Sequence, residues 1–187
     1  MGMRNNFISS IIVSTALFTG AAAQQYVPTA KGSKTELKFT YHKDDEAIKC
    51  SLGVIKGKIN FDPKKLSAAS FDITIGTSLL NTGITEWNKT VKSESFLNTA
   101  KYPAIHLKST SVTQDKAGSI VYIIHGNLTI KGITKMVNIQ FVATPLGAGY
   151  IFRGGFDVSR QGYDLGTKDD KLDDPVAMFI EIKADKR

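Results

Sequence analysis

Apolar and polar residues alternate with a period of two through most of the chain. In residues 69–75 the odd positions are apolar, whereas Ser70, Asp72 and Thr74 are polar. Residues 137–143 and 176–182 repeat this alternation. Because successive side chains of a strand point to opposite faces of a sheet, each run predicts a strand with one buried face.

Five further segments have the composition of strands and are bounded by turn-forming residues: 36–42, 47–61, 104–113, 119–130 and 149–158. Within 47–61 the apolar parity changes between Val54 and Ile55, close to Gly53 and Gly57, which predicts a bulge or a bend. Eight antiparallel strands can form a two-sheet sandwich or a closed barrel. Long strands joined by short hairpins favour an all-β, eight-stranded antiparallel barrel.

One segment breaks the strand pattern. Between Thr85 and Phe96, the apolar residues Trp87 and Val91 lie four positions apart, with polar residues on the other faces. This spacing predicts a short amphipathic helix that covers one flank or mouth of the barrel.

The first 23 residues have the pattern of a secretory signal peptide. Arg4 precedes an apolar stretch at 7–20, and Ala21-Ala22-Ala23 supplies the small residues of a cleavage site. We expect cleavage after Ala23, a flexible leader over 24–35 and a barrel domain over 36–187. Export to the periplasm or beyond follows from this interpretation.

The charge of the chain is moderately basic. Its formal net charge of +7 becomes +6 when Arg4 leaves with the signal peptide. Lysines and arginines are spread along the chain and form no nucleic-acid-binding motif, so we expect a solvated basic surface and no nucleic-acid partner. Weak contact with an anionic membrane surface is the alternative interpretation.

The residues that usually carry catalysis or bind metals form no known pattern. The single cysteine, Cys50, alternates with Ile48 and Leu52 and is expected in the core, and no G-x-S-x-G motif is present. The histidines at positions 42, 106 and 125 lack metal-ligand spacing, and the acidic segment 169–174 lacks the pattern of an EF-hand. We therefore expect no enzymatic activity, no metal and no cofactor.

The interior of such a barrel is either filled by its own side chains or holds one ligand. Small residues at Gly126, Gly154, Gly155 and Ala177 would leave room for a ligand, but glycine in a strand equally marks a bend. The pattern alone leaves both interpretations open.

Several short segments resemble one family. They are Phe61-Asp62-Pro63, the run 70–75, Phe96, Tyr102-Pro103-Ala104-Ile105 and Ser109-Thr110, with the strongest match in Gly126-Asn127-Leu128-Thr129-Ile130-Lys131-Gly132-Ile133-Thr134-Lys135. In order and spacing these segments resemble the YceI-like proteins. That family typically has a G-x-L-T-x-x-G-x-T-K sequence where this chain has residues 126–135. The similarity extends over 33–184.

This resemblance implies an exported lipocalin-like barrel with a helix beside it and an elongated apolar cavity for a polyisoprenoid or quinone lipid. It also implies a periplasmic protein that can form a homodimer. Combined with the alternation, it predicts that the lumen is lined by Phe71, Ile73, Ile75, Ile139, Phe141, Met178 and Ile180, and bordered on the helical side by Trp87, Val91 and Phe96.

The chain departs from the family in one polar segment. Where the family usually has R-D-x-H-L-R-S, this chain has Trp87-Asn88-Lys89-Thr90-Val91-Lys92-Ser93. Leu97 replaces a second aromatic residue, and Asp164 replaces a glycine after Tyr163. The roles of the replaced residues are therefore not carried over to this chain.

Two functions are compatible with these features. The first is an exported protein that sequesters or carries a long apolar lipid of polyisoprenoid or quinone type in the barrel interior. The second is an interaction or stress-response module whose barrel is filled and binds no lipid.

Overall fold

The computed structural model describes residues 24–29, 32–41, 46–168 and 171–187. The predicted signal peptide, His42 and the pair Asp169-Asp170 lie outside these residues. No helix in the described part is long and apolar enough to cross a bilayer.

The strands are β1 (Gln25–Pro28), β2 (Lys34–Tyr41), β3 (Glu46–Ser51), β4 (Ile55–Asn60), β5 (Ser70–Gly76), β6 (Ala104–Gln114), β7 (Val121–Ile130), β8 (Ile133–Leu146), β9 (Gly149–Val158) and β10 (Val176–Lys186). The helices are α1 (Thr85–Lys92) and two 3₁₀ turns, η1 (Leu66–Ala68) and η2 (Gln161–Tyr163).

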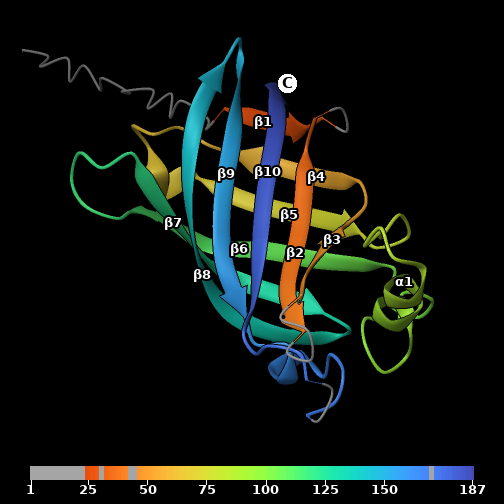
Figure 1. Cartoon of the computed structure of the whole chain (residues 1–187). Coiled ribbons are helices and arrows are strands. Elements are labelled where there is room, and N and C mark those ends of the chain that lie inside the picture. The colour runs from red at the N-terminus through yellow and green to blue at the C-terminus, as the bar shows by residue number, and fades with distance from the viewer. Residues whose placement is uncertain (1–23, 30–31, 42–45, 169–170) are drawn as a thin grey trace, which may run out of the picture.

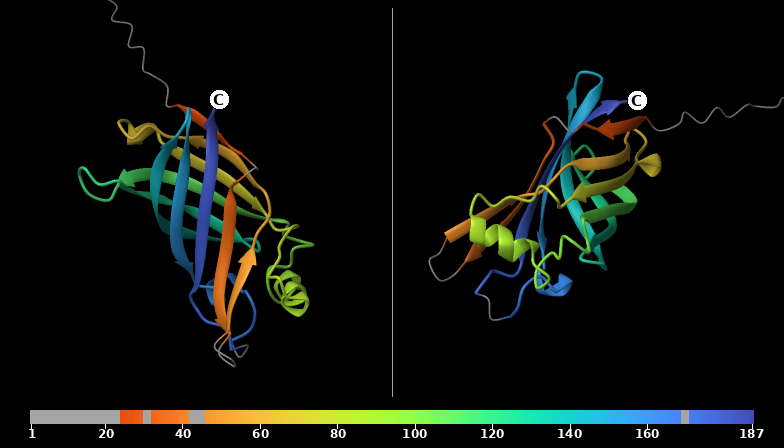
Figure 2. Two further views of the ribbon diagram at one scale, coloured as in Figure 1. Left: turned by 45° about the horizontal axis from the view of Figure 1, so that its top comes forward. Right: turned by 90° about the vertical axis from the view of Figure 1, so that its right-hand side faces the viewer.

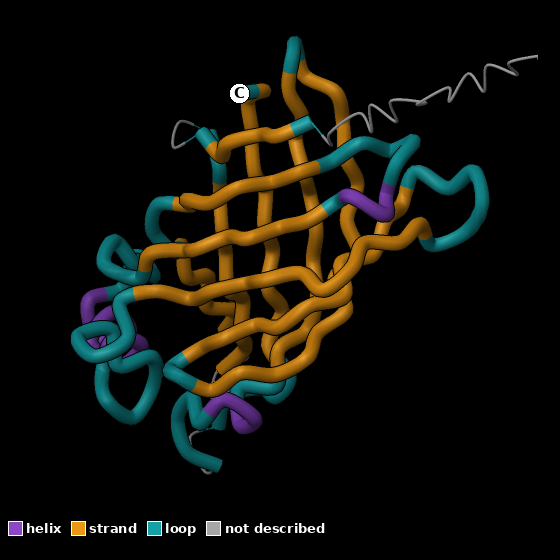
Figure 3. The backbone as a smooth tube through the Cα atoms, turned by 180° about the vertical axis from the view of Figure 1, so that it is seen from behind, coloured by secondary structure: helices purple, strands orange, loops and turns teal. Residues whose placement is uncertain are grey.

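Eight of these strands close into a barrel. Their order is β1-β4-β5-β6-β7-β8-β9-β10, every neighbouring pair is antiparallel, and β1 pairs with both β4 and β10. In Figure 1, β8, β9 and β10 form the front wall, and β4, β5 and β6 cross behind them. Figure 3 shows that rear wall from behind. The predicted all-β, eight-stranded antiparallel barrel with one flanking helix is confirmed.

The remaining two strands form a hairpin that widens one end of the barrel. Strand β2 pairs with β10 over Ala177–Glu181, whereas β1 pairs with β10 over Ala184–Lys186. Strand β3 pairs with β2 and forms the outer edge of the sheet. The barrel is therefore a closed ring at the β1 end and splits toward the other end, where β2 and β3 diverge from β4 (Figure 2).

The predicted strand over 47–61 is bent, as the change in apolar parity suggested. Residues 52–54 separate β3 from β4, so the chain leaves the β2 hairpin and joins the ring. Gly57 has a φ of +144°, and a Cβ there would collide with the carbonyl oxygen of Asp72. Only glycine fits this close approach of β4 to β5.

The segment expected to be a flexible leader, 24–35, contains β1 and the start of β2, so this expectation was wrong for its described residues. Tyr26 is only 2 % exposed and lies opposite Ile59 of β4 and Lys186 of β10. Strand β1 has four residues, too few to show an alternating pattern. Its stability comes from pairing on both edges, which the local sequence does not reveal.

Helix α1 lies beside the open edge of β3, within the connection from β5 to β6 (Figure 2). The backbones of Asn81 and Ser51 exchange two hydrogen bonds, of 2.9 and 3.0 Å, and the Thr77 N–H donates to the Pro103 carbonyl at 2.9 Å. The helix ends before the predicted Phe96, because Ser93 is extended and its hydroxyl donates to the Thr90 carbonyl. Val91 is the helical residue that is buried.

Candidate functional site

The barrel encloses a small apolar cavity of about 30 Å³. The lining side chains come from six consecutive strands of the ring, β5 to β10, and none is charged or polar: Phe71, Ile73, Leu107, Ile124, Ile139, Phe141, Phe152, Gly154, Ile180 and Ile182. Pockets that hold drug-sized ligands measure about 300–1,000 Å³. Most of the interior is therefore filled by the barrel's own side chains.

Aromatic rings close the β1 end of this cavity. Phe61, directly after β4, packs edge-to-face against Tyr122, Tyr150 and Phe152, with ring centroids 5.2, 5.5 and 5.4 Å away. It also contacts Phe141 at 5.9 Å. Edge-to-face pairs stabilise a core beyond the area that they bury. Phe141 and Phe152 belong to both the cluster and the cavity wall, so the cluster forms the inner end of the lumen.

Two buried side chains lie next to the cavity-lining residues on the α1 side of the barrel. Ile75 follows Ile73 by one alternation step on β5, and Met178 precedes Ile180 by one step on β10. Both side chains are fully buried. Methionine adapts its shape more readily than branched residues, so Met178 is the more deformable of the two.

A second, larger pocket of about 370 Å³ opens between α1 and the connection from β9 to β10. We call it the α1 pocket, and its lining residues are Trp87, Thr90, Ser95, Phe96, Gly166, Thr167 and Leu172. Phe96 and Leu172 are only 3 % and 7 % exposed and belong to the hydrophobic core. The pocket thus extends from solvent to the apolar interior.

Arg160 holds the far wall of the α1 pocket in place. Its side chain is 1 % exposed, and its Nε donates to the Asp173 carbonyl at 2.9 Å. The two terminal nitrogens donate to the carbonyls of Leu165 and Leu172, both at 2.8 Å, and of Thr167 at 3.2 Å. The guanidinium therefore joins the backbone at four described positions of the connection, 165, 167, 172 and 173, which a lysine, lacking the planar fork of donors, would not do.

The ten residues predicted to surround a ligand fall into three groups. Phe71, Ile73, Ile139, Phe141 and Ile180 line the interior cavity. Trp87 and Phe96 line the α1 pocket. Ile75, Met178 and Val91 are fully buried and line neither space.

Other residues of these two spaces were not predicted. Leu107, Ile124 and Phe152 alternate inward on β6, β7 and β9 as the predicted ones do on their strands, so extending the same pattern would have found them. The pocket residues Thr167 and Leu172, and Arg160 beneath them, have no such signal, because loop residues follow no period.

The polar candidates have structural contacts or are buried where the structure describes them. Cys50 is fully buried, and burial raises the pKa of its thiol to about 12 despite the opposing effect of the Lys92 charge, so it remains a protonated core residue. His106 contacts Asp72 at 2.8 Å on the surface, and His125 lies 2.7 Å from Asn138 and 3.0 Å from Thr113. Within the described ranges, no three His, Cys, Asp or Glu side chains gather as metal ligands would.

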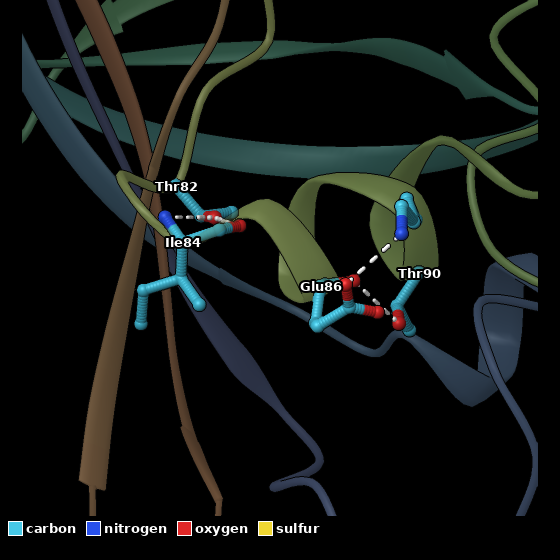
Figure 4. Close-up of polar contacts among 5 residues, drawn as sticks. Thr82, Ile84, Glu86 and Thr90 are labelled. Atoms are coloured by element: carbon cyan, nitrogen blue, oxygen red, sulfur yellow. Dashed lines mark hydrogen bonds and ion pairs between the residues drawn. The ribbon is translucent and has the colours of Figure 1, made fainter.

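The segment that departs from the family pattern has a structural role of its own. Asn88 accepts hydrogen bonds from the Thr82 N–H at 2.7 Å and the Thr82 hydroxyl at 3.0 Å, which fixes the turn before α1. Figure 4 shows this turn with Thr82 and Ile84, and also the Thr90 hydroxyl, which donates to the Glu86 carbonyl at 3.0 Å. The segment forms a helix although Trp87, Asn88 and Thr90 stand where the family usually has an arginine, an aspartate and a histidine.

The comparisons with known proteins agree with this architecture. A family model described as a YceI-like domain matches residues 29–184. A UPF0312 protein of Shewanella denitrificans is 31 % identical over 156 residues, which cover 82 % of this chain and 80 % of that protein. Among solved structures, Burkholderia cenocepacia BcnA has a TM-score of 0.71 at 21 % identity, covering 80 % of this chain and 95 % of BcnA.

A second solved structure is described as a polyisoprenoid binding domain from Saccharophagus degradans implicated in plant cell wall breakdown. It has a TM-score of 0.67 at 13 % identity and covers 88 % of this chain and 99 % of that one. The two TM-scores show a shared barrel fold. With a family model that matches most of its length and a relative above 30 % identity, this chain belongs to the YceI-like family.

Proposed function

We propose that this protein binds a lipid of polyisoprenoid or quinone type, with the hydrocarbon chain in the barrel and the head group in the α1 pocket. The supporting observation is one continuous cluster of buried apolar side chains. It includes Phe96 and Leu172 of the α1 pocket and the residues that line the wholly apolar interior cavity. Removing apolar area from water contributes about 25 cal/mol per Å², so a long chain gains affinity without a polar anchor. The solved polyisoprenoid binding domain of the same fold is consistent with such a ligand.

Binding requires the interior to expand. A cavity of about 30 Å³ does not hold an isoprenoid chain, so buried side chains on its α1 side, Ile75 and Met178 among them, have to move for the chain to enter from the α1 pocket. These are apolar side chains among apolar neighbours, and the incoming chain replaces the contacts that they lose. The ligand therefore forms part of the core of the complex.

Lipid that co-purifies with the protein is the expected result of this proposal. Native mass spectrometry and organic extraction of protein purified from an envelope without strong detergent should reveal an isoprenoid. Ile139→Trp should reduce the bound fraction strongly, because an indole in the cavity wall occupies the lumen, at a cost of about 1–3 kcal/mol in stability if space is tight.

The matched control is Ile120→Trp, at a side chain that is 72 % exposed, which should retain the lipid of the wild type. A folded wild-type protein that carries no lipid and takes up no polyprenol or quinone would refute the carrier function. The filled-barrel interaction module would then be favoured, and the small cavity and the aromatic cluster already fit it.

We also propose that the protein acts in the periplasm, where such lipids need a carrier through water. The sequence of residues 1–23 supports this. Intact-mass measurement of protein from the envelope fraction should show Gln24, or its pyroglutamate, at the N-terminus. Recovery of a chain that retains residues 7–20 would argue against export. Homodimer formation and weak contact with anionic membranes stay predictions.

A further inference from the structure

We infer that residues 77–103, which run from the end of β5 to the start of β6 and which we call the α1 connection, form a movable wall of the α1 pocket. The wall opens by parting from β3, and the point of release is the backbone bridge between Ser51 and Asn81. This inference rests on the proposed function. It adds how a long apolar ligand gains access to the interior.

The α1 pocket has two walls that are held in place differently. One belongs to the connection from β9 to β10, where the Arg160 guanidinium donates to four backbone carbonyls. The other belongs to the α1 connection, which contributes Trp87, Thr90, Ser95 and Phe96. Because Arg160 fixes the first wall, the attachments of the second wall decide whether the pocket can widen.

Among the described residues, few backbone hydrogen bonds join the middle of the α1 connection to other elements. Asn81 exchanges two with Ser51, of 2.9 and 3.0 Å, and the Ser51 hydroxyl also donates to the Asn81 carbonyl, at 3.0 Å. The Gly166 N–H donates to the Ser95 carbonyl at 2.7 Å. The Ser51–Asn81 pair is an isolated bridge at the outer edge of the sheet, beside which α1 lies in Figure 2. Segments attached by so few backbone hydrogen bonds open locally before the rest of a fold.

The α1 connection is tied at its two ends and bonded within itself. The Thr77 N–H donates to the Pro103 carbonyl at 2.9 Å, which brings the two ends together, and Thr77 is fully buried. After α1, the Leu97 N–H donates to the Val91 carbonyl at 3.1 Å. Because these hydrogen bonds do not involve β3, the segment can part from β3 as one body that turns about its joined ends.

Apolar side chains keep the wall closed when no ligand is bound. Leu80, Val91 and Leu97 of the α1 connection are buried in the core. Opening exposes part of their surface to water, so the open form is a minor population of the free protein. A hydrocarbon chain that enters covers the same surface and thereby favours the open form while it passes.

Cys50, the only cysteine of the chain, can report on this movement. It precedes Ser51 on β3, and its side chain is 0 % exposed. The Lys92 charge acts on the pKa of its thiol, so the end of α1 lies near that thiol. A buried thiol is inert. When the α1 connection parts from β3, we therefore expect Cys50 to react with N-ethylmaleimide.

Ser51→Pro tests the point of release in the whole protein. Proline lacks both the N–H and the hydroxyl that donate to the Asn81 carbonyl. Loss of two hydrogen bonds should raise the rate at which N-ethylmaleimide labels Cys50 by about tenfold or more. Uptake of a polyprenol, followed through the emission of Trp87, the only tryptophan, should accelerate by a similar factor.

Ala47→Pro is the matched control in the same strand. Alternate residues of an antiparallel strand direct their N–H groups to the same edge, so the Ala47 N–H faces the outer edge of β3 as that of Ser51 does. This variant leaves the bridge to Asn81 intact and should be labelled, and take up the polyprenol, at the rates of the wild type. Below the unfolding transition, labelling of Ser51→Pro should change little with urea, because the local opening exposes little surface.

Three results would overturn the inference while lipid binding stands. They are equal labelling of Ser51→Pro and Ala47→Pro, labelling of Ser51→Pro that depends steeply on urea as global unfolding does, and faster labelling without faster uptake. If none of the three proteins takes up a polyprenol, the proposed function fails and the entrance fails with it, whereas labelling of Cys50 still shows whether the wall moves.

Discussion

Arg160→Met is expected to lower the free energy of unfolding by about 3 kcal/mol or more, because a buried carbonyl that loses its donor costs about 1–3 kcal/mol and four carbonyls lose theirs here. In a domain of this size, this corresponds to a fall in melting temperature of about 6–12 °C. Urea unfolding monitored by circular dichroism measures the change. Methionine keeps much of the apolar stem of arginine, so the loss of stability measures the contribution of the guanidinium group.

The control is Arg153→Met on β9. Arg153 forms a 2.6 Å ion pair with Glu181 on the outside of the barrel, and its side chain is 53 % exposed. Exposed pairs contribute about 0–1 kcal/mol, so this variant should unfold close to the wild type. Equal losses in the two variants would contradict the role given to Arg160. A loss confined to faster hydrogen exchange over 164–174 would show that Arg160 stabilises the connection alone rather than the barrel.

Phe61→Ala should destabilise the barrel by a similar amount, about 3–5 kcal/mol. Its ring is 1 % exposed and lies at the centre of the aromatic cluster, so its removal leaves a hole that adjoins the interior cavity. The variant should therefore also take up more of an apolar fluorescent dye than the wild type. Thermal unfolding and dye titration measure the two effects.

Phe179→Ala is the matched control for this substitution. Phe179 lies on the same sheet but points outward, with its side chain half exposed over Gly155. Its removal should cost less than about 1 kcal/mol and leave dye uptake unchanged. If Phe61→Ala were as stable as Phe179→Ala, the aromatic cluster would not be a central part of the core.

The sequence was sufficient to predict the barrel because the inward and outward positions of a strand follow from its pleat. Ile73 and Ile139 were predicted to face the interior from the alternation together with the resemblance to the family, and both line the cavity. Strand β1 was not predicted, because its four residues are held in place by pairing with strands that are distant in the sequence. Local pattern carries no information on such pairing.

The candidate site was predictable only in part. The α1 pocket joins residues 87–96 to residues 166–172, and nothing in either segment signals the other. The size of the interior cavity depends on how side chains from six strands fit together, which alternation does not determine. Resemblance to the family suggested an elongated cavity, whereas the packed aromatic rings leave only about 30 Å³ open.

The closing seam between β1 and β10 also bears on the order of assembly. Tyr26 lies opposite Lys186, so the contacts that complete the ring join residues 160 positions apart (186 − 26 = 160). Contacts of such long range form late and slow the folding of a chain, since a large loop must close before they contribute. Strand β10 is the strand that joins β9 to β1, so without it the other strands of the ring cannot form a closed barrel. The barrel therefore closes only when β1 and β10, from opposite ends of the fold, pair with each other.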